Sequence, residues 1–498
     1  LAVRSPRVRH ALVHSSQHPR ALLSALYRAA VQGAAPFPRT RDAVHAWFTA
    51  RPSLSERTPV YVIALEKAAP AMMAGALDAL EQLQRVVHGG LVVAAHEPKR
   101  GEVGSDLPSR IPLMVGDHPV PGPASLDAAD ALDELAHRID EGSVVLVLLS
   151  GGTTSLCAAP IATLSQAVGD ADRAQAHVAN LAETLLASGL AIHEMNAIRR
   201  RVLRWGAGRL AVALVQHGAE HVPVFAISDV IGDDPAVIGS GPCSPDPLDD
   251  ATFLALLDAH DMRSRVERVM GTVLGLEGAG DPPRVPNRDH PAFARVGYTL
   301  VARNADAVQA LADEARALGI AHVVVQQTPL EGDAAELGDQ LARLALQAAP
   351  NVQGDTVLVC GGEPVVNLRE TTSRAPSDED GHLLDPSWSD EPLRGGRMQL
   401  LALSAALALE AAAAHGDARA WKVTVMAAGT DGRDGPTDAA GAIVDAAVPA
   451  LARRAGRIPE DDLSTGRSWF PLDAADALLR PGPTGTNVMD VVALLIRG

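Results

Sequence analysis

Short apolar runs alternate with longer amphipathic stretches along most of this 498-residue chain. Apolar runs bounded by Gly, Asp or Ser are typical of buried strands, and apolar residues at helical spacing are typical of helices. Strands are predicted at 60–64, 90–95, 144–149, 222–227, 297–302, 322–326, 357–360 and 423–428. Helices are predicted at 68–80, 125–139, 164–188, after Asn196, and at 398–414. This alternation predicts a largely parallel, doubly wound α/β sheet with binding sites at the carboxyl ends of its strands.

Two segments depart from the alternation. The first 41 residues contain arginines but no acidic residue, a composition that superficially resembles a transit peptide. Leu22, Leu23, Leu26 and Tyr27 nevertheless have helical spacing, so we expect a first helix that packs on the domain. Residues 369–394 are acidic and show little periodicity, and we expect a solvated flap there.

Composition narrows the class of protein. A chain this long exceeds the size of one hydrophobic core, so two domains are expected. The net charge of −17 argues against a nucleic-acid partner, which needs a basic face. Three widely spaced cysteines disfavour a disulfide framework, and the longest aliphatic run, 144–149, is too short to cross a bilayer. We therefore expect a soluble, cytoplasmic protein that binds neither nucleic acid nor membrane.

Lysine use singles out one position. Of the 43 basic residues only Lys67, Lys99 and Lys422 are lysines, so arginine serves almost everywhere a cation is needed. Lys67 follows the strand 60–64 and opens an Ala-rich helical stretch, where helix N–H groups favour anions. Lys99 lies in a polar turn and Lys422 precedes a strand, as surface charges do. Lys67 is therefore the candidate for a functional ammonium, and a solvated lysine in a turn is the alternative.

Glycine-rich and acidic loops follow several strands. The loop Gly429-Thr430-Asp431-Gly432-Arg433-Asp434 combines glycines, which let backbone amides approach an anion, with carboxylates that suit a hard cation. Ser150, Gly151, Gly152 and Thr153 end the strand at 144–149 and present N–H donors of the kind that bind phosphate or carboxylate. Neither a Walker loop nor a G-x-G-x-x-G fingerprint occurs, which disfavours ordinary P-loop and dinucleotide enzymes. Plain turn formation by Asp and Gly is the alternative.

Further polar residues stand at element ends. Asp229 follows the strand at 222–227 after Ser228 and is expected to face a site, whereas capping of a helix after Pro235 is the alternative for Asp234. Arg397 opens the helix at 398–414 and offers a planar fork to a carboxylate or phosphate, with a surface ion pair as the alternative. His118 is a possible base, but we interpret this His-Pro turn as structural.

Taken in order, the motifs resemble those of a known family. They are K-A-A at 67–69, G-D-H-P-V-P at 116–121, S-G-G at 150–152, N-x-I-R at 196–199, S-D-V-I-G-D-D-P at 228–235, G-G-E at 361–363, G-G-R-x-Q at 395–399, G-T-D-G-x-D-G-P-T-D-A-A-G at 429–441 and P-T-G-T-N-V-x-D at 483–490. The set is similar to that of the glycerate 2-kinase family, whose C-terminal half is the MOFRL domain and whose members are sometimes labelled hydroxypyruvate reductases. The similarity runs from about residue 10 to the end of the chain.

The resemblance implies a fold and an activity. It implies an N-terminal Rossmann-like domain over 1–250, a connecting α/β segment over 251–350 and a smaller MOFRL-type domain over 351–498, with the active site in the cleft between domains. It implies ATP- and Mg²⁺-dependent phosphorylation of the 2-hydroxyl of D-glycerate or a related small hydroxy acid, and a homodimer is one possibility. It also implies a set of residues that bind the substrate and the nucleotide. They are Ser150, Gly151, Gly152, Thr153, Asn196, Gly362, Glu363, Gly429, Thr430 and Asn487.

The resemblance also assigns roles. Lys67 and Arg397 neutralise the transferring phosphoryl group or hold the acid, Asp229 or Asp431 accepts the hydroxyl proton, and Asp233 or Asp434 binds Mg²⁺. Glu66 stands where the family usually has glycine, Met398 and Leu400 flank Gln399 in place of polar residues, and 199–208 is unusually rich in arginine. These departures leave two alternatives: an NAD-linked hydroxypyruvate reductase and a catalytically silent relative that binds a sugar acid.

Overall fold

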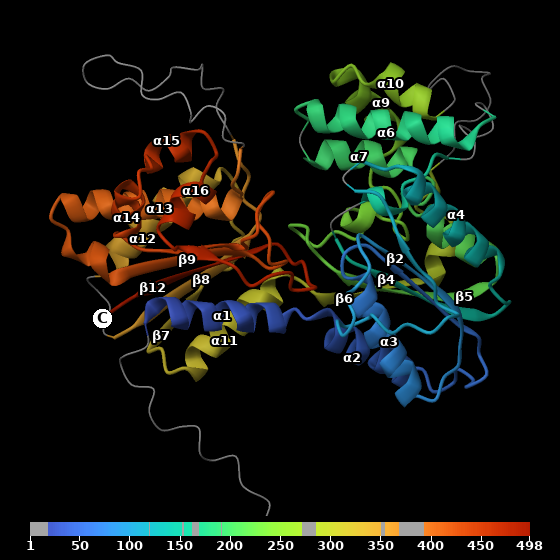
Figure 1. Ribbon diagram of the computed structural model, residues 1–498. Helices are drawn as coiled ribbons and strands as arrows, with labels where there is room; N and C mark the ends of the chain where they lie inside the picture. Colours follow the sequence, from blue (N-terminus) through green and yellow to red (C-terminus); the bar gives the residue numbers. More distant parts are fainter. Residues whose placement is uncertain are drawn as a thin grey trace, which may run out of the picture. The chain divides into compact units, whose positions relative to one another are not determined.

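The computed structural model divides the chain into two compact units, each with its own sheet (Figure 1). The parallel unit comprises Ala35–Arg303 and Gly485–Asn487, and the mixed unit comprises Asn304–Thr484, Val488–Gly498 and the N-terminal segment that ends at Ala34. The structure describes residues 18–118, 120–151, 154–161, 169–190, 192–270, 285–349, 354–367 and 393–498. The acidic segment expected to form a flap lies almost entirely outside these residues.

The parallel unit is built on six parallel strands. They are β1 (Val60–Leu65), β2 (Val87–Ala94), β3 (Leu113–Val115), β4 (Ser143–Leu149), β5 (Ala219–Ile227) and β6 (Val296–Ala302), in the order β3-β2-β1-β4-β5-β6. Every residue of β1 and β4 is buried, as expected for central strands covered on both faces. This order places the topological switch point between β1 and β4.

Helices cover both faces of this sheet and form a separate layer beyond it. α2 (Pro36–Thr49) and α3 (Ala69–Gln82) pack on one face, and α4 (Pro123–His137) and α8 (Arg209–Gln216) pack on the other. A further cluster, with an apolar core of its own, stands at the top of the unit in Figure 1. It consists of α6 (Ala171–Ala187), α7 (Ile192–Val202), α9 (Asp250–Ala259) and α10 (Arg263–Met270).

The mixed unit has a second six-stranded sheet. Its strands are β7 (His322–Val325), β8 (Thr356–Gly362), β9 (Val423–Gly429), β10 (Gly441–Val444), β11 (Leu478–Leu479) and β12 (Asp490–Ile496), in the order β11-β10-β9-β12-β8-β7. β12 runs antiparallel to both neighbours, β8 and β9. The amino end of β12 therefore lies between the carboxyl ends of β8 and β9.

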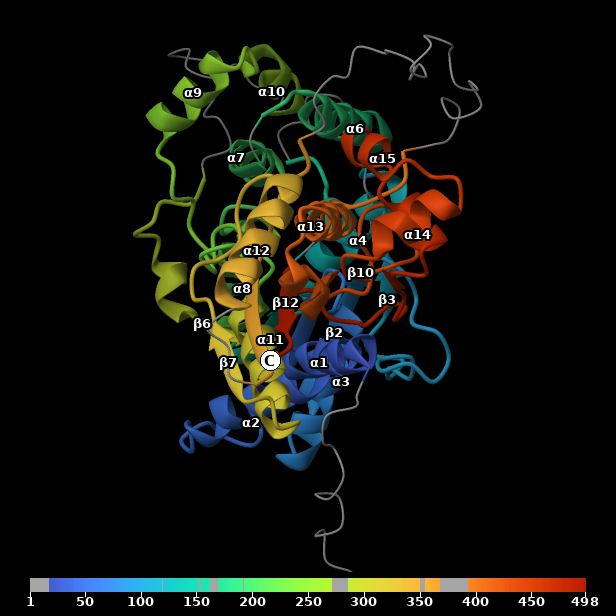
Figure 2. The ribbon, with the colours of Figure 1, turned by 90° about the vertical axis from the view of Figure 1, so that its left-hand side faces the viewer.

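Two helical layers enclose the mixed sheet (Figure 2). α12 (Ala334–Ala348) and α13 (Arg397–Ala414) pack side by side on one face, with α14 (Val448–Arg454), α15 (Pro459–Ser464) and α16 (Trp469–Ala474) around α13. α11 (Asn304–Ala317) covers the other face together with α1 (Pro19–Gly33), the first helix that the sequence predicted. The N-terminal helix thus belongs to the unit that is otherwise formed by the end of the chain.

The two-domain α/β fold is confirmed, with two corrections. A largely parallel arrangement holds for the first sheet only, because β10, β11 and β12 add antiparallel pairs to the second. The basic helix expected after Asn196 is present as α7, but its bounds differ: it begins before Asn196 and ends at Val202, so Arg204 lies beyond it and Arg209 opens α8. Between α7 and α8, Ala207 and Gly208 have φ values of 53° and 80°. The domain boundaries and the interdomain cleft remain predictions.

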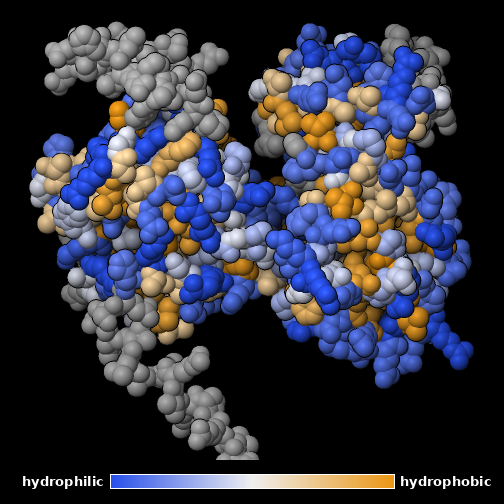
Figure 3. Space-filling view, viewed as in Figure 1, coloured by the Kyte–Doolittle hydropathy of each residue, from blue (hydrophilic) through white to orange (hydrophobic). Residues whose placement is uncertain are grey.

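One helix of the described chain, α13, is long and apolar enough to cross a membrane by length and composition. Within the mixed unit it packs against α12, β9 and β10, and 56% of it is buried, as in the core helix of a globular unit. On the face shown in Figure 3, hydrophilic residues cover much of each unit, with apolar residues between them.

Candidate active site

Three adjacent strands of the parallel unit end in predicted site residues. Lys67 follows β1 by two positions, Ser150 and Gly151 follow β4 directly, and Asp229 follows β5 by two positions. Because β1, β4 and β5 are parallel neighbours, their carboxyl ends meet at one edge of the sheet. The switch point, where the crossovers diverge, is where open α/β sheets bind ligands. We call Lys67, Ser150, Gly151, Asp229 and Asn487 the switch-point site.

Ser150 fixes the turn that carries Lys67. Its hydroxyl accepts a hydrogen bond from the backbone N–H of Ala68 at 3.0 Å and is within 3.4 Å of the Leu65 carbonyl. Ala68 is the N-cap residue of α3, and its own side chain cannot cap a helix. The fully buried Ser150 therefore ties the end of β4 to the start of α3.

Gly151, Asp229 and Asn487 come together. A Cβ atom at position 151 would lie 1.5 Å from Asp229 Oδ1, so only glycine allows this approach. The Asn487 amide donates to Asp229 Oδ2 at 3.1 Å, although 258 positions separate the two residues. Three predicted site residues thus meet as one group. The predicted residues Gly152 and Thr153 lie outside the described residues.

Two titratable groups interact with the turn that carries Glu66 and Lys67. Burial and the charge of Lys67 lower the pKa of His118, whose ring nitrogen Nδ1 lies 3.2 Å from Ser155 Oγ. His118, which the sequence analysis set aside as structural, is therefore close enough to Lys67 to sense its charge. Burial above all, and then the charge of Glu66, raises the pKa of the Cys157 thiol, which keeps the thiol protonated.

Glu66 occupies a backbone conformation that normally belongs to glycine. Its φ is 89°, and it is buried between the end of β1 and Lys67. A non-glycine residue in this region carries backbone strain of order 1–3 kcal/mol. The geometry explains why the family resemblance has glycine at this position.

The remaining predicted residues of this unit have other settings. Asn196 lies half-buried inside α7. Asp233 has a φ of 54° and pairs with Arg303 at 3.4 Å. Asp234 accepts the backbone N–H of Ala236 at 2.9 Å within a turn, whereas the next helical turn, Ile238–Ser240, has Val237 as its N-cap.

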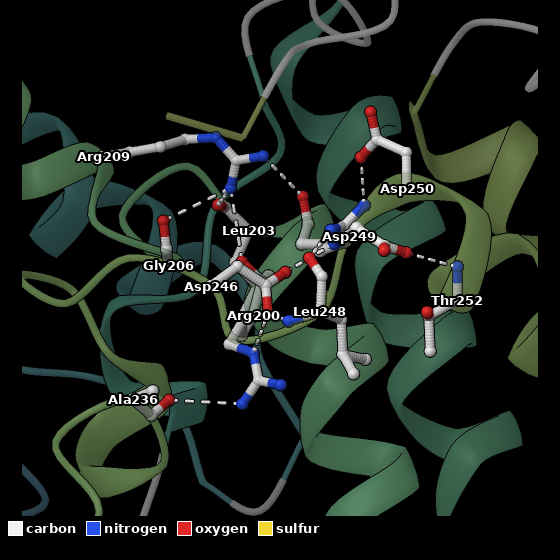
Figure 4. Close-up of polar contacts among 11 residues, drawn as sticks. Arg200, Leu203, Gly206, Arg209, Ala236, Asp246, Leu248, Asp249, Asp250 and Thr252 are labelled. Atoms are coloured by element: carbon white, nitrogen blue, oxygen red, sulfur yellow. Dashed lines mark hydrogen bonds and ion pairs between the residues drawn. The ribbon is translucent and has the colours of Figure 1, made fainter. Parts of the chain in front are cut away.

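The arginine-rich segment forms a buried cluster (Figure 4). Arg200 and Arg201 both pair with Asp246, Arg200 at 3.1 Å, and Arg201 also pairs with Asp250 at 2.6 Å. Arg209 donates to four backbone carbonyls around the end of α7, those of Arg200, Arg201, Leu203 and Gly206. These arginines therefore have structural partners, and burial lowers the pKa of Arg209 to about 10.

In the mixed unit, Asp434 caps α13. The N-cap residue Gly396 has no side chain, and Asp434 Oδ1 and Oδ2 accept the backbone N–H groups of Met398 and Gln399 at 3.2 and 2.7 Å. Gln399 also donates from its side chain to Thr437 Oγ1 at 2.7 Å. Both carboxylate oxygens of Asp434 thus have helix N–H partners, which favours a capping role over metal binding.

Arg397, the first residue of α13, lies between two carboxylates. Its Nη1 donates to Glu363 Oε1 at 2.9 Å, and its Nε lies 2.6 Å from Asp490 Oδ2. Glu363 follows Gly362 at the end of β8, and Asp490 opens β12. The sequence-predicted Arg397 and Glu363 therefore meet, together with Asp490, which the sequence analysis did not select. We call Arg397, Glu363 and Asp490 the arginine site.

Burial makes the acids of this region unusual. Burial raises the pKa of Asp434 to about 7 and that of Asp490 to about 6. The Asp490 charge adds to the increase at Asp434, and Arg397 opposes the increase at Asp490. Two carboxyl groups of this unit therefore titrate near neutral pH, a property common at functional sites.

Hydrogen bonds from several residues fix the loop after β9. The fully buried Thr430 hydroxyl donates to the Met489 carbonyl at 2.7 Å and accepts from the Val488 N–H at 2.9 Å. The Tyr27 hydroxyl of α1 donates to the Gly429 carbonyl at 2.8 Å. Asp431 Oδ1 accepts the N–H of Arg433 at 3.0 Å. Tyr27 and Thr430 thus fix the backbone next to Asp431.

Sequence reasoning missed Asp490 and Tyr27 as parts of this region. Asp490 is the last residue of the P-T-G-T-N-V-x-D motif, which was one available signal. An acid at the amino end of a strand is not expected to face a site in a parallel sheet, but in an antiparallel pair it lies beside a carboxyl end. Tyr27 had no signal beyond its helical spacing.

No group of three or more His, Cys, Asp or Glu side chains in the described parts of the chain is arranged to hold a metal ion. Mg²⁺ in phosphate-binding enzymes needs only one or two carboxylates, because phosphate and water complete its shell. Asp233 is half-buried in a loop that follows a strand, and it fits such a role better than the fully engaged Asp434.

An all-parallel sheet with a lysine at its switch point, and a second unit with an arginine between carboxylates, are features of a two-unit α/β enzyme. Comparison with known proteins is consistent with this class. Residues 22–275 match a domain of unknown function, DUF4147, and residues 356–490 match the MOFRL family.

Individual relatives cover nearly the whole chain. The D-glycerate 2-kinase of Thermotoga maritima is 30% identical over 444 residues, which are 88% of this chain and 90% of that protein. A putative hydroxypyruvate reductase of Agrobacterium vitis is 33% identical, over 86% of this chain and 97% of the relative. A crystal structure of a Thermotoga maritima glycerate kinase matches with a TM-score of 0.72 and 26% identity, over 96% and 99% of the two chains.

The chain belongs to the glycerate 2-kinase family. It is therefore an enzyme of the kinase class. The family expected from the sequence motifs is confirmed, whereas the roles of individual site residues remain predictions.

Proposed function

We propose that this enzyme uses ATP and Mg²⁺ to phosphorylate the 2-hydroxyl of D-glycerate, or of a related small hydroxy acid, and that the D-glycerate product is 2-phosphoglycerate. The observation that carries the proposal is Lys67 at the switch point of an all-parallel sheet, beside the start of α3. The names of the relatives, among them glycerate 2-kinases from Pyrococcus horikoshii and Thermotoga maritima, support this acceptor.

Charge defines the roles of the residues. Phosphoryl transfer depends mainly on positioning and on neutralising charge. The bond between the γ-phosphorus and the ADP oxygen breaks, and a bond to the 2-oxygen of the acid forms. Lys67 and Arg397 neutralise the transferring group or hold the acid carboxylate, and Asp229 or Asp431 accepts the hydroxyl proton.

The other proposed ligand contacts follow the motifs. Backbone N–H groups at Gly151 and around Gly429 lie at strand ends, where they can donate to phosphate or carboxylate oxygens. Asp233 would hold Mg²⁺ together with ATP phosphates. When bound, the cation supplies charge neutralisation between the phosphate oxygens.

A direct assay tests the proposal. Purified protein is incubated with ATP, Mg²⁺ and a panel of small hydroxy acids, and both ADP release and the phosphorylated product are measured. D-glycerate is expected to give 2-phosphoglycerate with equal amounts of ADP. ADP release without a phosphorylated acid, or no reaction with any acid, would contradict the proposal.

Replacement of Lys67 tests the site itself. Lys67→Ala should lower turnover by roughly two to three orders of magnitude, because one preorganised charge commonly contributes about 3–4 kcal/mol to barrier lowering. The matched control is Lys99→Ala, which removes an exposed lysine from the same unit and should leave turnover unchanged. Wild-type turnover in Lys67→Ala would remove this residue from the mechanism.

A hydroxypyruvate reductase is the second candidate. Two Agrobacterium vitis relatives carry that name, and the strand order of the parallel unit is the one common in dinucleotide-binding sheets. The chain has Glu66-Lys67-Ala68 after β1 in place of a glycine-rich fingerprint, which counts against it. Consumption of NADH or NADPH with hydroxypyruvate, followed by absorbance of the reduced nicotinamide, would favour this candidate.

A silent binding relative would show a different result, namely tight binding of D-glycerate by calorimetry without ATP consumption.

Two further expectations stay predictions. Light scattering would test the possible homodimer, and microscopy of a tagged protein would test the cytoplasmic location.

A further inference from the structure

Asp490 occupies a position that the backbone of the mixed unit holds firmly. In the two antiparallel ladders it pairs with Gly362 of β8 and Gly429 of β9. Its carbonyl also accepts a hydrogen bond from the Asn304 side chain at 2.9 Å. The Asp490 side chain therefore starts from a fixed point between two strand ends and reaches Arg397.

The two carboxylates that hold Arg397 differ in burial. Asp490 lies 2.6 Å from Nε and 3.4 Å from Nη2 of Arg397, and its side chain is 5% exposed. Glu363 lies 2.9 Å from Nη1, and its side chain is 39% exposed. Breaking a buried ion pair is costly, whereas an exposed pair is weak. Asp490 is therefore the lasting partner of Arg397, and Glu363 is the partner that water can replace.

The formal charges make this difference matter. One guanidinium and two carboxylates give the arginine site a formal charge of −1, which opposes the approach of an anion to Arg397. Two further acids are coupled to this site: the charge of Asp431 raises the pKa of Asp490, and the charge of Asp490 raises the pKa of Asp434. An anionic group gains most from Arg397 if the partly exposed Glu363 moves into water, because Asp490 then still orients the guanidinium.

We propose that Asp490 is the positioning residue of Arg397, and that Glu363 is a displaceable partner which leaves Arg397 when an anionic group of the substrate binds. The inference rests on the proposed kinase function and adds to it a division of roles within the arginine site. A purely structural ion pair is the alternative. Asp434 already caps α13 through Met398 and Gln399, so the start of this helix does not depend on the Arg397 side chain.

Two isosteric variants separate the roles. Asp490→Asn should lower kcat by about 10- to 100-fold, as expected for a misplaced catalytic group, with a smaller change in KM. Glu363→Gln should lower KM for the anionic substrate up to about fivefold with little change in kcat, the range expected for a partly exposed ion pair. The control is Glu410→Gln, which removes a half-buried carboxylate from the Arg453 pair in the same unit and should change neither constant.

The pH profile provides a readout that a structural role would not move. The groups that face Asp490 are Arg397, Glu363, Asp431, Asp434 and the Tyr27 phenol. In the wild type, kcat should fall below about pH 6, where Asp490 takes up a proton and no longer holds Arg397. Asp490→Asn should lose this limb of the profile.

Each outcome decides the inference. Wild-type kcat in Asp490→Asn, or a raised KM in Glu363→Gln, would overturn it. If Asp490→Asn does not fold, Arg397→Ala with millimolar guanidinium replaces it. Partial rescue of turnover is expected, because Asp490 would still hold the ion, and absence of rescue counts against the proposal. If the wild type phosphorylates no acid, the kinase function fails, and calorimetry with D-glycerate and ATP decides: equal affinity in Glu363→Gln and the wild type overturns the inference.

Discussion

Single residues show which site features can be predicted from the sequence and which cannot. Lys67 was found because a rare lysine stands at a strand-to-helix junction, a feature that depends only on local sequence. Asp490 was not found from the sequence, because its pairing with Gly362 and Gly429 joins strands that lie 128 and 61 positions away in the chain. Local chemistry can be predicted from sequence, whereas a contact made across an antiparallel ladder needs the register.

Glu66 is the residue where sequence and backbone disagree most. Glu66→Gly should relieve the strain of a positive φ and raise the free energy of unfolding by roughly 1 kcal/mol relative to Glu66→Gln. Both variants remove the negative charge beside Lys67, so both should lower KM for the anionic substrates. Chemical denaturation and steady-state kinetics provide the two measurements. Equal stability of the two variants would show that the strain is small.

Asp434 should make stability depend on pH. Its pKa is raised from 3.8 to about 7 in the folded protein, so the folded state holds its proton more tightly than the unfolded state. Its contribution to stability is full below about pH 4 and is lost as pH rises through 7. The slope is at most about 1.4 kcal/mol per pH unit for this group.

The matched variant for this effect is Asp434→Asn, which cannot titrate. It should cost about 1–2 kcal/mol at low pH, because one helix N–H of α13 loses its acceptor. Its deficit relative to the wild type should shrink between pH 4 and 7. Thermal unfolding of both proteins at several pH values measures the difference. Parallel curves would mean that Asp434 does not take up a proton in this range.

At the scale of elements, regular strands were easier to predict than short ones. The apolar runs at 60–64, 144–149 and 222–227 became β1, β4 and β5, because a fully buried parallel strand leaves a continuous apolar signal. β3 and β11 have three and two residues, too few for any periodicity. The break between α7 and α8 was missed because the helical arginines continue across it, and only the backbone shows the turn.

The arginine cluster is the element whose stability depends most on a single acid. Asp246→Asn should lower the free energy of unfolding by about 3–5 kcal/mol, because Arg200 and Arg201 would keep their buried charges without their shared partner. The control is Asp258→Asn in the same helical layer, where the Arg263 pair is exposed and a loss of about 0–1 kcal/mol is expected. Similar losses in both variants would show that the cluster contributes no more than a surface pair.

At the scale of the whole molecule, candidate residues divide between the two units. Lys67 and Asp229 belong to the parallel unit, and Arg397, Glu363 and Asp431 belong to the mixed unit. The order of the motifs along the chain suggested one site. The spacing of residues in the sequence does not show which groups act on the same substrate. Kinetics can supply that information, because groups that act on the same transition state are coupled.

A double-mutant cycle between Lys67 and Arg397 tests whether both units serve one reaction. Each single alanine variant should lower kcat/KM by about 10²- to 10³-fold, since each removes a charge from the transferring phosphoryl group or the acid. If the two residues act as a unit, the kcat/KM of the double variant should be at most about tenfold below that of the less active single variant. The control pairs Lys67→Ala with Arg453→Ala, a half-exposed arginine of the mixed unit bonded to Glu410 and Glu460. That pair should show no coupling. Fully multiplicative losses for Lys67 and Arg397 would mean that the two residues contribute independently, and the single-site proposal would have to be abandoned.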